Sequence, residues 1–506
     1  MIKYFFISIF YFQIIFAQSP NSFKFDAESE SHLSNSVTDI IAKGDSLILG
    51  TGKGLSISPN GGLSWKNFFN TNDFAQEDIS AMSINKNEFW IATAHSENKN
   101  DEYLPVGSGI RFSNNGGATW ISFEQPTDIN NIDTLQYGIN KIRAIGVTTK
   151  VYNLCYDIAA SDSAIYIASF AGMLRKSIDK GITWSRVILP PDYLSSIKPT
   201  DTLKFDLSPS SGALELVGNL NHRVFSVIID KNKFVWVGTA NGINKSIDGG
   251  VSWKKFSYNN QSSPISGNFV VALYEQNFNN KKIIWASTIN AESQNEKRGV
   301  SFTIDDGITW KQTLLGEFAH NFASYDSVVY VATDNGIFRS DDFGNSWIKN
   351  GSIFDLKNNY FYTSNKFYSV ARQKTNFWAG GTDGLVSTFD STKNQFGRNW
   401  LIYRTSQKDL AKLSYAFPNP FSPDDEVVRI RYSLDKNSKV TLRIFDFGMN
   451  LVKTLLQNYD RNANSKVEEI WNGKDEVGNF VANGIYFYQL TIDSQKSDWG
   501  KILVIQ

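Results

Sequence analysis

Short runs in which apolar and polar residues alternate recur along most of the chain, and Gly, Asn, Asp and Ser separate them. Residues 235–239 read Val-Trp-Val-Gly-Thr, and similar runs lie at 89–93, 165–169, 329–333 and 377–381. Period-two alternation with turn residues at this spacing predicts β-strands of about 4–8 residues. We therefore expect an all-β protein built from short antiparallel strands.

A turn motif of the form Ser/Thr-x-Asp/Asn-x-Gly-x-Ser/Thr-Trp recurs between these runs. The Asp or Asn side chain can bond nearby backbone N–H groups, the glycine can adopt a positive φ, and the tryptophan returns apolar surface to the sheet. The acidic or amide residue and the tryptophan of each copy are Asn60 and Trp65, Asn115 and Trp120, Asp179 and Trp184, Asp248 and Trp253, Asp305 and Trp310, Asp342 and Trp347, and Asp390 and Trp400. An insertion interrupts the seventh copy after Asp390. We assign these residues a structural role.

The repeat implies a ring. Each motif follows three strand-like runs and precedes a fourth, and stacking such four-stranded units radially buries both of their apolar faces. We predict a seven-bladed β-propeller over residues 22–404, with six or eight blades as the alternatives. Residues 22–25 are expected to pair into the last blade.

These motifs resemble the Asp-box (BNR-repeat) propellers of sialidases, sortilin-like receptors, xyloglucanases and photosystem II assembly factors. The resemblance covers residues 22–405 and implies the propeller fold. It does not select a function, because that family includes enzymes, receptors and assembly factors. The Arg-Ile-Pro motif of sialidases does not occur in this sequence.

A second module follows a polar connector at residues 405–414. Its alternating runs, separated by Gly and Asn turns, predict a small Ig-like β-sandwich over residues 415–506. They lie at residues 428–433, 439–445, 467–471, 484–491 and 501–505.

Residues 418–421 (Pro-Asn-Pro-Phe), 471–475 (Trp-Asn-Gly-Lys-Asp) and 484–488 (Gly-Ile-Tyr-Phe-Tyr) make this module similar to the FlgD-like Ig domain of flagellar hook capping proteins. That domain overlaps the type IX secretion (T9SS type A) sorting domains of exported bacterial proteins. The resemblance implies a module for secretion or surface attachment that contacts the secretion machinery. A plain structural domain is the alternative.

The first 17 residues read as a signal peptide. Lys3 precedes a mostly apolar run at residues 4–16, and Ala17 supplies a small residue for cleavage. An apolar run of this length is too short for a membrane anchor, and no later run of about 20 apolar residues follows. We expect a secreted or cell-surface protein with no transmembrane segment in its mature chain.

Charge and composition argue against several kinds of chemistry. The 50 basic and 50 acidic residues balance, so the chain has no long-range field that attracts nucleic acid, and the sequence has no dense run of Lys and Arg. The four histidines (His32, His95, His222 and His320) have no metal-ligand spacing, and a lone Cys155 cannot form an internal disulfide. We therefore expect no metal, no cofactor and no catalytic residues.

Function is expected on one face of the ring. Segments 94–107, 124–140, 189–220, 257–267 and 288–298 are long, and strand order predicts that they emerge on the face opposite the Asp boxes, where binding loops are commonly found. We predict a non-enzymatic protein that binds a protein or glycan there. The alternatives are an envelope assembly factor and a glycoside hydrolase or lyase, whose acidic pair would come from Asp101, Glu102, Asp201 and Glu292.

Overall fold

The computed structural model describes residues 29–99, 102–130, 132–207, 220–291, 293–358, 360–373, 375–391, 396–405, 414–424, 426–434, 436–493 and 497–505. The described residues form strands and turns, with one short 3-10 helix, η1 (Leu220–His222). None of their helices is long and apolar enough to cross a membrane. The predicted signal peptide, the pairing segment 22–25 and connector residues 406–413 lie outside the described residues.

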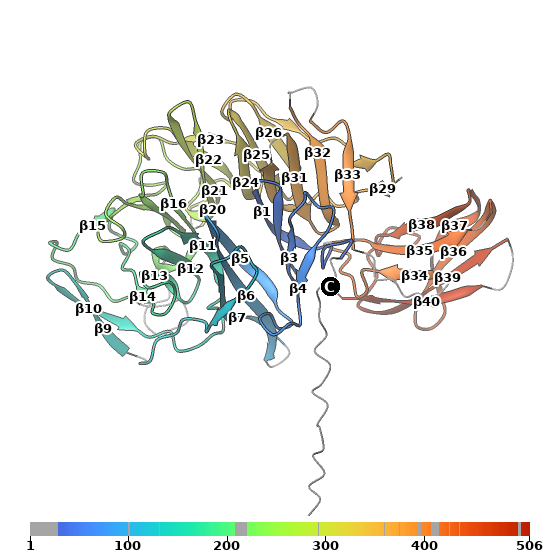
Figure 1. Ribbon diagram of the computed structural model, residues 1–506, viewed down its shortest axis with the longest axis horizontal. Helices are drawn as coiled ribbons and strands as arrows, with labels where there is room; N and C mark the ends of the chain where they lie inside the picture. Colours follow the sequence, from blue (N-terminus) through green and yellow to red (C-terminus); the bar gives the residue numbers. More distant parts are fainter. Residues whose placement is uncertain are drawn as a thin grey trace, which may run out of the picture.

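Antiparallel sheets of four consecutive strands make up the ring in Figure 1, and we number these blades 1 to 7 in chain order. The strands of the first four are β1 (Val37–Lys43), β2 (Ser46–Thr51), β3 (Gly54–Ser58) and β4 (Lys66–Phe68); β5 (Asp78–Asn85), β6 (Glu88–Lys99), β7 (Glu102–Ser113) and β8 (Ile121–Phe123); β11 (Cys155–Ala160), β12 (Ile165–Ser169), β13 (Met173–Ser177) and β14 (Ser185–Arg186); β16 (Val224–Ile229), β17 (Val235–Thr239), β18 (Gly242–Ser246) and β19 (Trp253–Phe256).

The ring continues through three more blades. Their strands are β20 (Phe269–Phe278), β21 (Lys281–Ile289), β22 (Gly299–Thr303) and β23 (Lys311–Thr313); β24 (Ala319–Tyr325), β25 (Val328–Thr333), β26 (Gly336–Ser340) and β27 (Ile348–Lys349); β30 (Phe367–Gln373), β31 (Asn376–Gly381), β32 (Gly384–Phe389) and β33 (Trp400–Tyr403). The first strand of each blade lies innermost, against the first strands of its neighbours. The all-β class and the propeller fold predicted from the sequence are confirmed.

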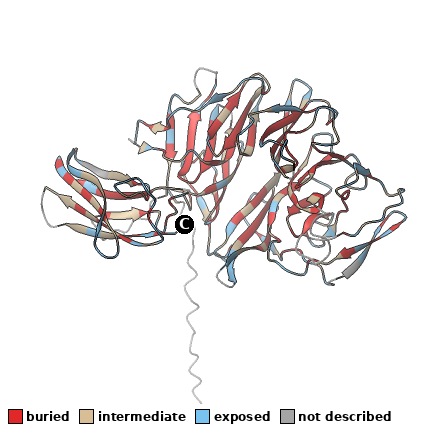
Figure 2. Cartoon of the chain, turned by 180° about the vertical axis from the view of Figure 1, so that it is seen from behind, coloured by how far each residue is buried: buried red, intermediate tan, exposed pale blue. Residues whose placement is uncertain are grey.

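The hydrophobic core lies between the blades (Figure 2). All five residues of β17 are buried, because both faces of that strand meet a neighbouring blade. Trp236 and Phe256 of blade 4, for example, pack in one cluster with Ile284 and Trp310 of blade 5. Each fully buried large apolar side chain contributes about 1.5–3 kcal/mol, so the contact between blades is the main source of stability.

Side-chain packing closes the ring between its last and first blades. Val37 and Trp65 of blade 1 pack with Trp378 and Leu385 of blade 7. Asn35 adds two hydrogen bonds, since its carbonyl accepts from the N–H of Gly384 at 2.8 Å and its side chain accepts from the N–H of Thr405 at 2.8 Å. Among the described residues, no strand is exchanged between the two blades.

The long segments do not all stay on the face opposite the Asp boxes, which corrects our expectation. Segment 94–107 is a paired extension of β6 and β7. The segments before blades 4 and 5 run along outer strands to the box side. Ile197 pairs with Trp253, and the carbonyl of Ser263 accepts from the N–H of Trp310 at 3.0 Å. Pairing covers a strand edge that would otherwise be bare.

One of these insertions contains a short hairpin, and another adds a strand to a blade. β9 (Ile132–Tyr137) and β10 (Asn140–Ile145) form the hairpin before blade 3, and Tyr137 donates a hydrogen bond to the carbonyl of Val251, inside the box of blade 4. β15 (Ser196–Ile197) is the extra outer strand of blade 4. Before blade 7, β28 (Phe354–Asp355) and β29 (Tyr360–Phe361) form a further hairpin that the sequence analysis did not anticipate.

Two packed sheets form a β-sandwich after the ring. One sheet has the order β34 (Ser414–Phe417), β35 (Val428–Leu434), β38 (Asn464–Trp471), and the other has the order β37 (Leu451–Arg461), β36 (Ser438–Phe445), β39 (Gly484–Ile492), β40 (Asp498–Val504). In β35 the alternation divides the strand between two environments. Val428 and Ile430 enter the sandwich core, and Arg429 and Arg431 lie on the other face, yet all four are buried.

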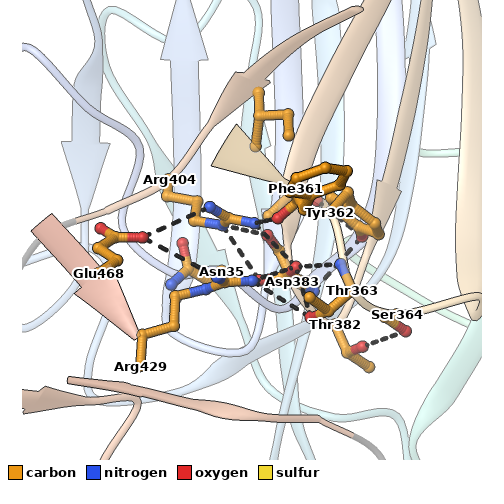
Figure 3. A network of polar contacts seen from close by, with 12 residues as sticks. Asn35, Phe361, Tyr362, Thr363, Ser364, Thr382, Asp383, Arg404, Arg429 and Glu468 are labelled. Atoms are coloured by element: carbon orange, nitrogen blue, oxygen red, sulfur yellow. Dashed lines mark hydrogen bonds and ion pairs between the residues drawn. The ribbon is translucent and has the colours of Figure 1, made fainter. Parts of the chain in front are cut away.

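A cluster of charged side chains joins blade 7 to the sandwich (Figure 3). Asp383, in the turn between β31 and β32, accepts hydrogen bonds from Arg429 at 2.7 and 2.8 Å and from Arg404 at 2.9 Å. The N–H of Thr363 donates to the same carboxylate at 2.9 Å. Burial raises the pKa of Asp383, but the charges of Arg429 and Arg404 outweigh it and hold that pKa below its usual value.

Glu468 of β38 completes this junction cluster on the sandwich side. It accepts a hydrogen bond from Arg431 at 2.7 Å and lies 3.8 Å from Arg404 and 3.9 Å from Arg429. The five charged side chains are each at most 10 % exposed. Removing one of these side chains would leave its partners buried without an opposite charge, which is energetically costly. The cluster therefore holds the sandwich in a defined position on blade 7.

Replacing Arg429 with Leu should lower the free energy of unfolding by about 3–5 kcal/mol, because part of the compensation of buried Asp383 and Glu468 is lost. Arg443→Leu is the matched control, since Arg443 bonds Gln457 on the exposed side of the same sandwich, and it should change stability by less than about 0.5 kcal/mol. Urea unfolding of both variants measures the difference. Equal stability of the two would show that the junction cluster contributes nothing.

Candidate functional site

The Asp boxes form compact turns on one face of the ring, each between the third and fourth strands of a blade. In blade 4, Asp248 Oδ1 accepts hydrogen bonds from the Ser246 hydroxyl at 2.8 Å and from the N–H of Ser252 at 2.9 Å. The Ser246 hydroxyl in turn accepts from the N–H of Gly250 at 2.8 Å. All of these hydrogen bonds lie within the turn, so the Asp248 carboxylate stabilises the turn itself.

Asn and Asp are interchangeable in this turn because the last hydroxyl can reverse its role. In blade 1, Asn60 Nδ2 donates to the Ser64 hydroxyl at 2.9 Å, whereas in blade 3 the Thr183 hydroxyl donates to Asp179 Oδ2 at 2.5 Å. The hydrogen bonds from the side chain and backbone of Thr183 lower the pKa of Asp179 to about 2. The box tryptophans are buried, except Trp184 and Trp347, which are half-buried.

In blades 1 to 6, the glycine three residues before the box tryptophan lies where two blades touch. Gly307 of blade 5 has a φ of +91°, and a Cβ there would lie 2.7 Å from the Phe256 ring of blade 4. Gly344 of blade 6 approaches Trp285 of blade 5 in the same way, at 2.8 Å. Gly307 and Gly344 must therefore be glycine for their backbone conformation and also for the contact with the neighbouring blade.

The seventh copy uses its acidic residue differently. Asp390 is buried, and its Oδ2 accepts hydrogen bonds from Arg339 at 2.8 Å and from the Tyr330 hydroxyl, both in blade 6. Gly397 and buried Trp400 still follow it. The described part of the broken copy thus joins two blades through an ion pair instead of closing a turn.

The loop carboxylates proposed for a hydrolase are not brought together. Asp101 and Glu292 lie outside the described residues. Glu102 is exposed near the tip of the hairpin of blade 2, whereas Asp201 lies in the insertion before blade 4 and accepts a hydrogen bond from the N–H of Lys198 at 2.9 Å. No acid–base pair arises from Glu102 and Asp201.

The innermost strand of every blade contains a β-bulge near its start. The pairing register skips one residue in each, and we call these the bulge residues: Thr38, Ser80, Tyr156, Phe225, Val271, His320 and Tyr368. Each follows a buried residue, and all seven are at least partly exposed. A bulge redirects a side chain that would otherwise point into the sheet packing.

All seven bulge residues line one cavity of about 370 Å³ at the centre of the ring. Inner strands enter the ring on the face opposite the Asp boxes, and the bulges lie at this entrance. We call the opening that they surround the channel mouth. A cavity of this size is in the range of small-ligand sites, which are concave and carry a few polar groups.

Aromatic rings cover much of the channel mouth. On blades 3 to 5, Phe225 contacts Tyr156, Phe170 and Phe269 with ring centroids 5.5, 5.9 and 4.4 Å apart. On blades 6 and 7, His320 lies 5.4 Å from Tyr368. Blades 1 and 2 contribute the small polar residues Thr38 and Ser80 to the lining instead. The mouth is therefore lined by aromatic bulge residues on blades 3, 4, 6 and 7, by Val271 on blade 5, and by small polar residues on blades 1 and 2.

Two carboxyl groups lie inside the same cavity. Asp39 and Asp157 each accept a hydrogen bond from the next residue's N–H at 2.8 Å, and Asp157 also accepts from the N–H of Val227 in blade 4 at 2.8 Å. Burial raises the pKa of Asp39 to about 6 and that of Asp157 to about 7, and the charge of Asp39 adds to the second shift. Both groups therefore exchange protons near neutral pH.

The lone cysteine and the possible metal ligands show no sign of a chemical role. Cys155 is fully buried, its thiol lies 3.2 Å from the carbonyl of Asp157, and burial raises the pKa of that thiol far above its usual value. Such a thiol is not an active nucleophile. Within the described ranges, no group of three His, Cys, Asp or Glu side chains could hold a metal ion.

The sequence analysis missed the bulge residues, although the sequence contains a signal for them. Each inner strand begins with a buried residue, a variable residue, a small or polar residue and a second apolar residue, as in residues 37–40 (Val-Thr-Asp-Ile) and 155–158 (Cys-Tyr-Asp-Ile). The break in alternation after the variable residue marks the bulge.

Comparison with known proteins gives neither a family nor a close relative. No family model and no curated protein matches the chain in sequence. Among solved structures, it is similar to PorZ, a bacterial surface component of the type-IX secretion system of Porphyromonas gingivalis, with 14 % identity, a TM-score of 0.33, and coverage of 93 % of this chain and 75 % of that one.

Two further structures are similar to a comparable degree. YCF48 from Cyanidioschyzon merolae has 16 % identity and a TM-score of 0.42, over 71 % of this chain and 96 % of that one. The GH74 xyloglucanase from Xanthomonas campestris has 11 % identity and a TM-score of 0.49, over 90 % of this chain and 64 % of that one. At these values the likenesses say nothing about what the chain binds or does.

Replacing Gly307 with Ala tests the contact between blades. Gly316 is the matched control, because its φ of +95° is similar but its Cβ would meet no atom within 4 Å. Gly316→Ala should lower the free energy of unfolding by about 1 kcal/mol through backbone strain alone. Gly307→Ala should show the same strain and lose about 1–3 kcal/mol more through overpacking against Phe256. Urea unfolding measures both. Equal losses would contradict the close approach of Phe256.

The channel carboxyl groups should make stability depend on pH. The unfolded chain ionises Asp39 near pH 4 and the folded chain near pH 6, so the folded state holds more protons between them and stability falls as pH rises through this window. Asp39→Asn removes this dependence. The variant should therefore gain stability over the parent between pH 4 and pH 7 and keep the gain above it, as urea midpoints would show. A difference in stability between the variant and the parent that does not change with pH would contradict the raised pKa of Asp39.

Proposed function

We propose that this protein is an exported, non-enzymatic propeller that binds a protein or glycan at the channel mouth. The observation that carries the proposal is the repeated bulge. Seven inner strands each give up one regular pairing position, and every one of the seven redirected residues lines the same cavity. Packing of the blades does not need those side chains, because each remains partly exposed.

The chemistry of the mouth suits binding. Tyr156 and Phe225 offer partly exposed ring faces that can pack against a sugar ring or an apolar side chain, and Thr38, Ser80 and Asn321 can supply hydrogen bonds. A rigid ring holds these groups at fixed positions, so little conformational freedom is lost when a ligand binds.

The surroundings of the two carboxyl groups favour binding over hydrolysis. A glycoside hydrolase needs two opposed carboxyl groups about 5–10 Å apart. Among the described lining residues only Asp39 and Asp157 are acidic, and both oxygens of Asp157 already accept backbone hydrogen bonds. These bonds hold the Asp157 carboxyl group in place, which argues against its use as a general acid or a nucleophile.

The sandwich is proposed to serve secretion or surface attachment. Its β34–β35–β38 sheet is occupied by the junction cluster, so the β37–β36–β39–β40 sheet is the surface left for other contacts. That sheet and its turns carry exposed Phe447, Tyr459 and Trp499. Large apolar side chains on a surface are suited to contact with another protein, here the secretion machinery.

Glycan and peptide arrays probed with residues 18–506 test the binding proposal. A Tyr156→Ala/Phe225→Ala variant should lose at least about tenfold in affinity for the strongest array ligand, because removing central aromatic contacts typically costs that much. Ile182→Ala/Ile247→Ala, on exposed positions of the Asp-box side, is the matched control and should bind as the parent does.

The same array ligands should remain intact after incubation with the protein. Equal loss in the control variant, or unchanged binding by the mouth variant, would contradict binding at the channel mouth. Cleavage of a glycan that Asp157→Asn abolishes would replace the binding proposal with the hydrolase alternative.

A further inference from the structure

The cavity behind the channel mouth contains acidic groups without a basic partner. Its titratable lining residues are Asp39 on β1, Tyr156 and Asp157 on β11, His320 on β24 and Tyr368 on β30. The strands β5, β16 and β20 contribute lining residues without charge, and no lining residue in the described part of the chain is lysine or arginine. By contrast, the buried acids Asp383 and Asp230 meet arginine and lysine respectively.

Asp39 is the more open of the two carboxyl groups. Its Oδ1 accepts a hydrogen bond from the N–H of Ile40, and no described donor reaches Oδ2. Asp157 lies close enough for the two charges to repel each other. Two carboxylates that repel each other in a confined site are stabilised when a cation enters between them. The attraction between opposite charges at short range can then offset the cost of removing them from water.

The mouth through which a cation would pass attracts positive charge. The rings of Tyr156, Phe225 and Tyr368 line it, and the face of an aromatic ring attracts cations. The Lys366 ammonium group already lies over the Tyr368 ring, 5.5 Å from its centroid, so Tyr156 and Phe225 are the rings that a ligand cation would meet. His320 does not oppose this, because burial lowers its pKa, although its hydrogen bond to Asp334 at 2.7 Å acts in the opposite direction. At neutral pH the lining thus carries no positive charge.

We propose that this cavity receives an alkylammonium group, supplied either by a lysine side chain of a protein ligand or by a free amine. The proposal rests on the proposed function, because it uses the same mouth. An aliphatic stem with a charged end matches the layout of the site, since the stem contacts the rings while the ammonium group reaches Asp39 and Asp157 beneath them.

Binding should depend on pH in a defined direction. The ammonium group needs ionised carboxylates, and Asp39 and Asp157 ionise near pH 6 and pH 7. Affinity should therefore rise between pH 5 and pH 8, and at pH 5 it should be at least about tenfold weaker, because less than about a tenth of either group is ionised there. Binding at pH 6.5 should release protons.

Calorimetric titration of residues 18–506 with n-butylammonium, and with n-butanol as the uncharged probe, tests the proposal. We expect butylammonium to bind at pH 8 and butanol to bind at least tenfold more weakly. Asp39→Asn should weaken butylammonium binding at least tenfold while keeping the bond to Ile40, and Tyr156→Leu should weaken it through loss of the ring face. Asp162→Asn, on the exposed turn between β11 and β12, is the control and should not change it.

The source of the amine is resolved by comparing an acetyl-Gly-Lys-Gly-amide peptide with putrescine, and binding of either one supports the ammonium site. Equal binding of butanol and butylammonium, stronger binding at pH 5 than at pH 8, or unchanged binding by Asp39→Asn would each overturn it. The experiment separates failure of the ammonium site from failure of the proposed binding function. Array ligands that still depend on Tyr156 and Phe225, with no amine bound, would leave binding at the mouth intact.

Discussion

The close contact between one blade and the glycine of the next Asp box is the constraint on which this structure depends. At Gly307 and Gly344 the backbone turns left-handed while lying against an aromatic ring of the preceding blade. The internal hydrogen bonds of each box hold that turn in shape, and its tryptophan returns to the core. Blades 1 to 6 therefore meet the preceding blade through the same turn, closely at Gly307 and Gly344, and a ring follows from repeating this contact.

The ring in turn creates the site. The strands of each blade pack against the neighbouring blades, and the innermost strand also faces the central space of the ring. The bulges in these strands turn seven variable side chains into that central space. The aromatic rings at the mouth and the half-buried carboxyl groups of Asp39 and Asp157 beneath it line this space together, and no lysine or arginine of the described chain lines it with them.

The sandwich is attached by a different kind of interaction. Asp383 and Glu468 meet three arginines in a region without solvent, where hydrogen-bond geometry allows one arrangement. Asp383 belongs to a turn that opens on the same face as the channel mouth, so the sandwich is anchored on the face of the ring that we propose for binding. A module docked in this way has a fixed orientation relative to the mouth.

The sequence by itself determined the all-β class and the repeat of strands and turns, because alternation and Gly/Asp turns are local properties of the chain. Only the tertiary structure decided which groups meet. Arg404 and Arg429 are unremarkable in sequence, and Glu102 lies on blade 2 whereas Asp201 lies in the insertion before blade 4. Thr38 and Tyr368 share a cavity although 330 positions separate them. Such convergence depends on how the blades close the ring, which no local pattern records.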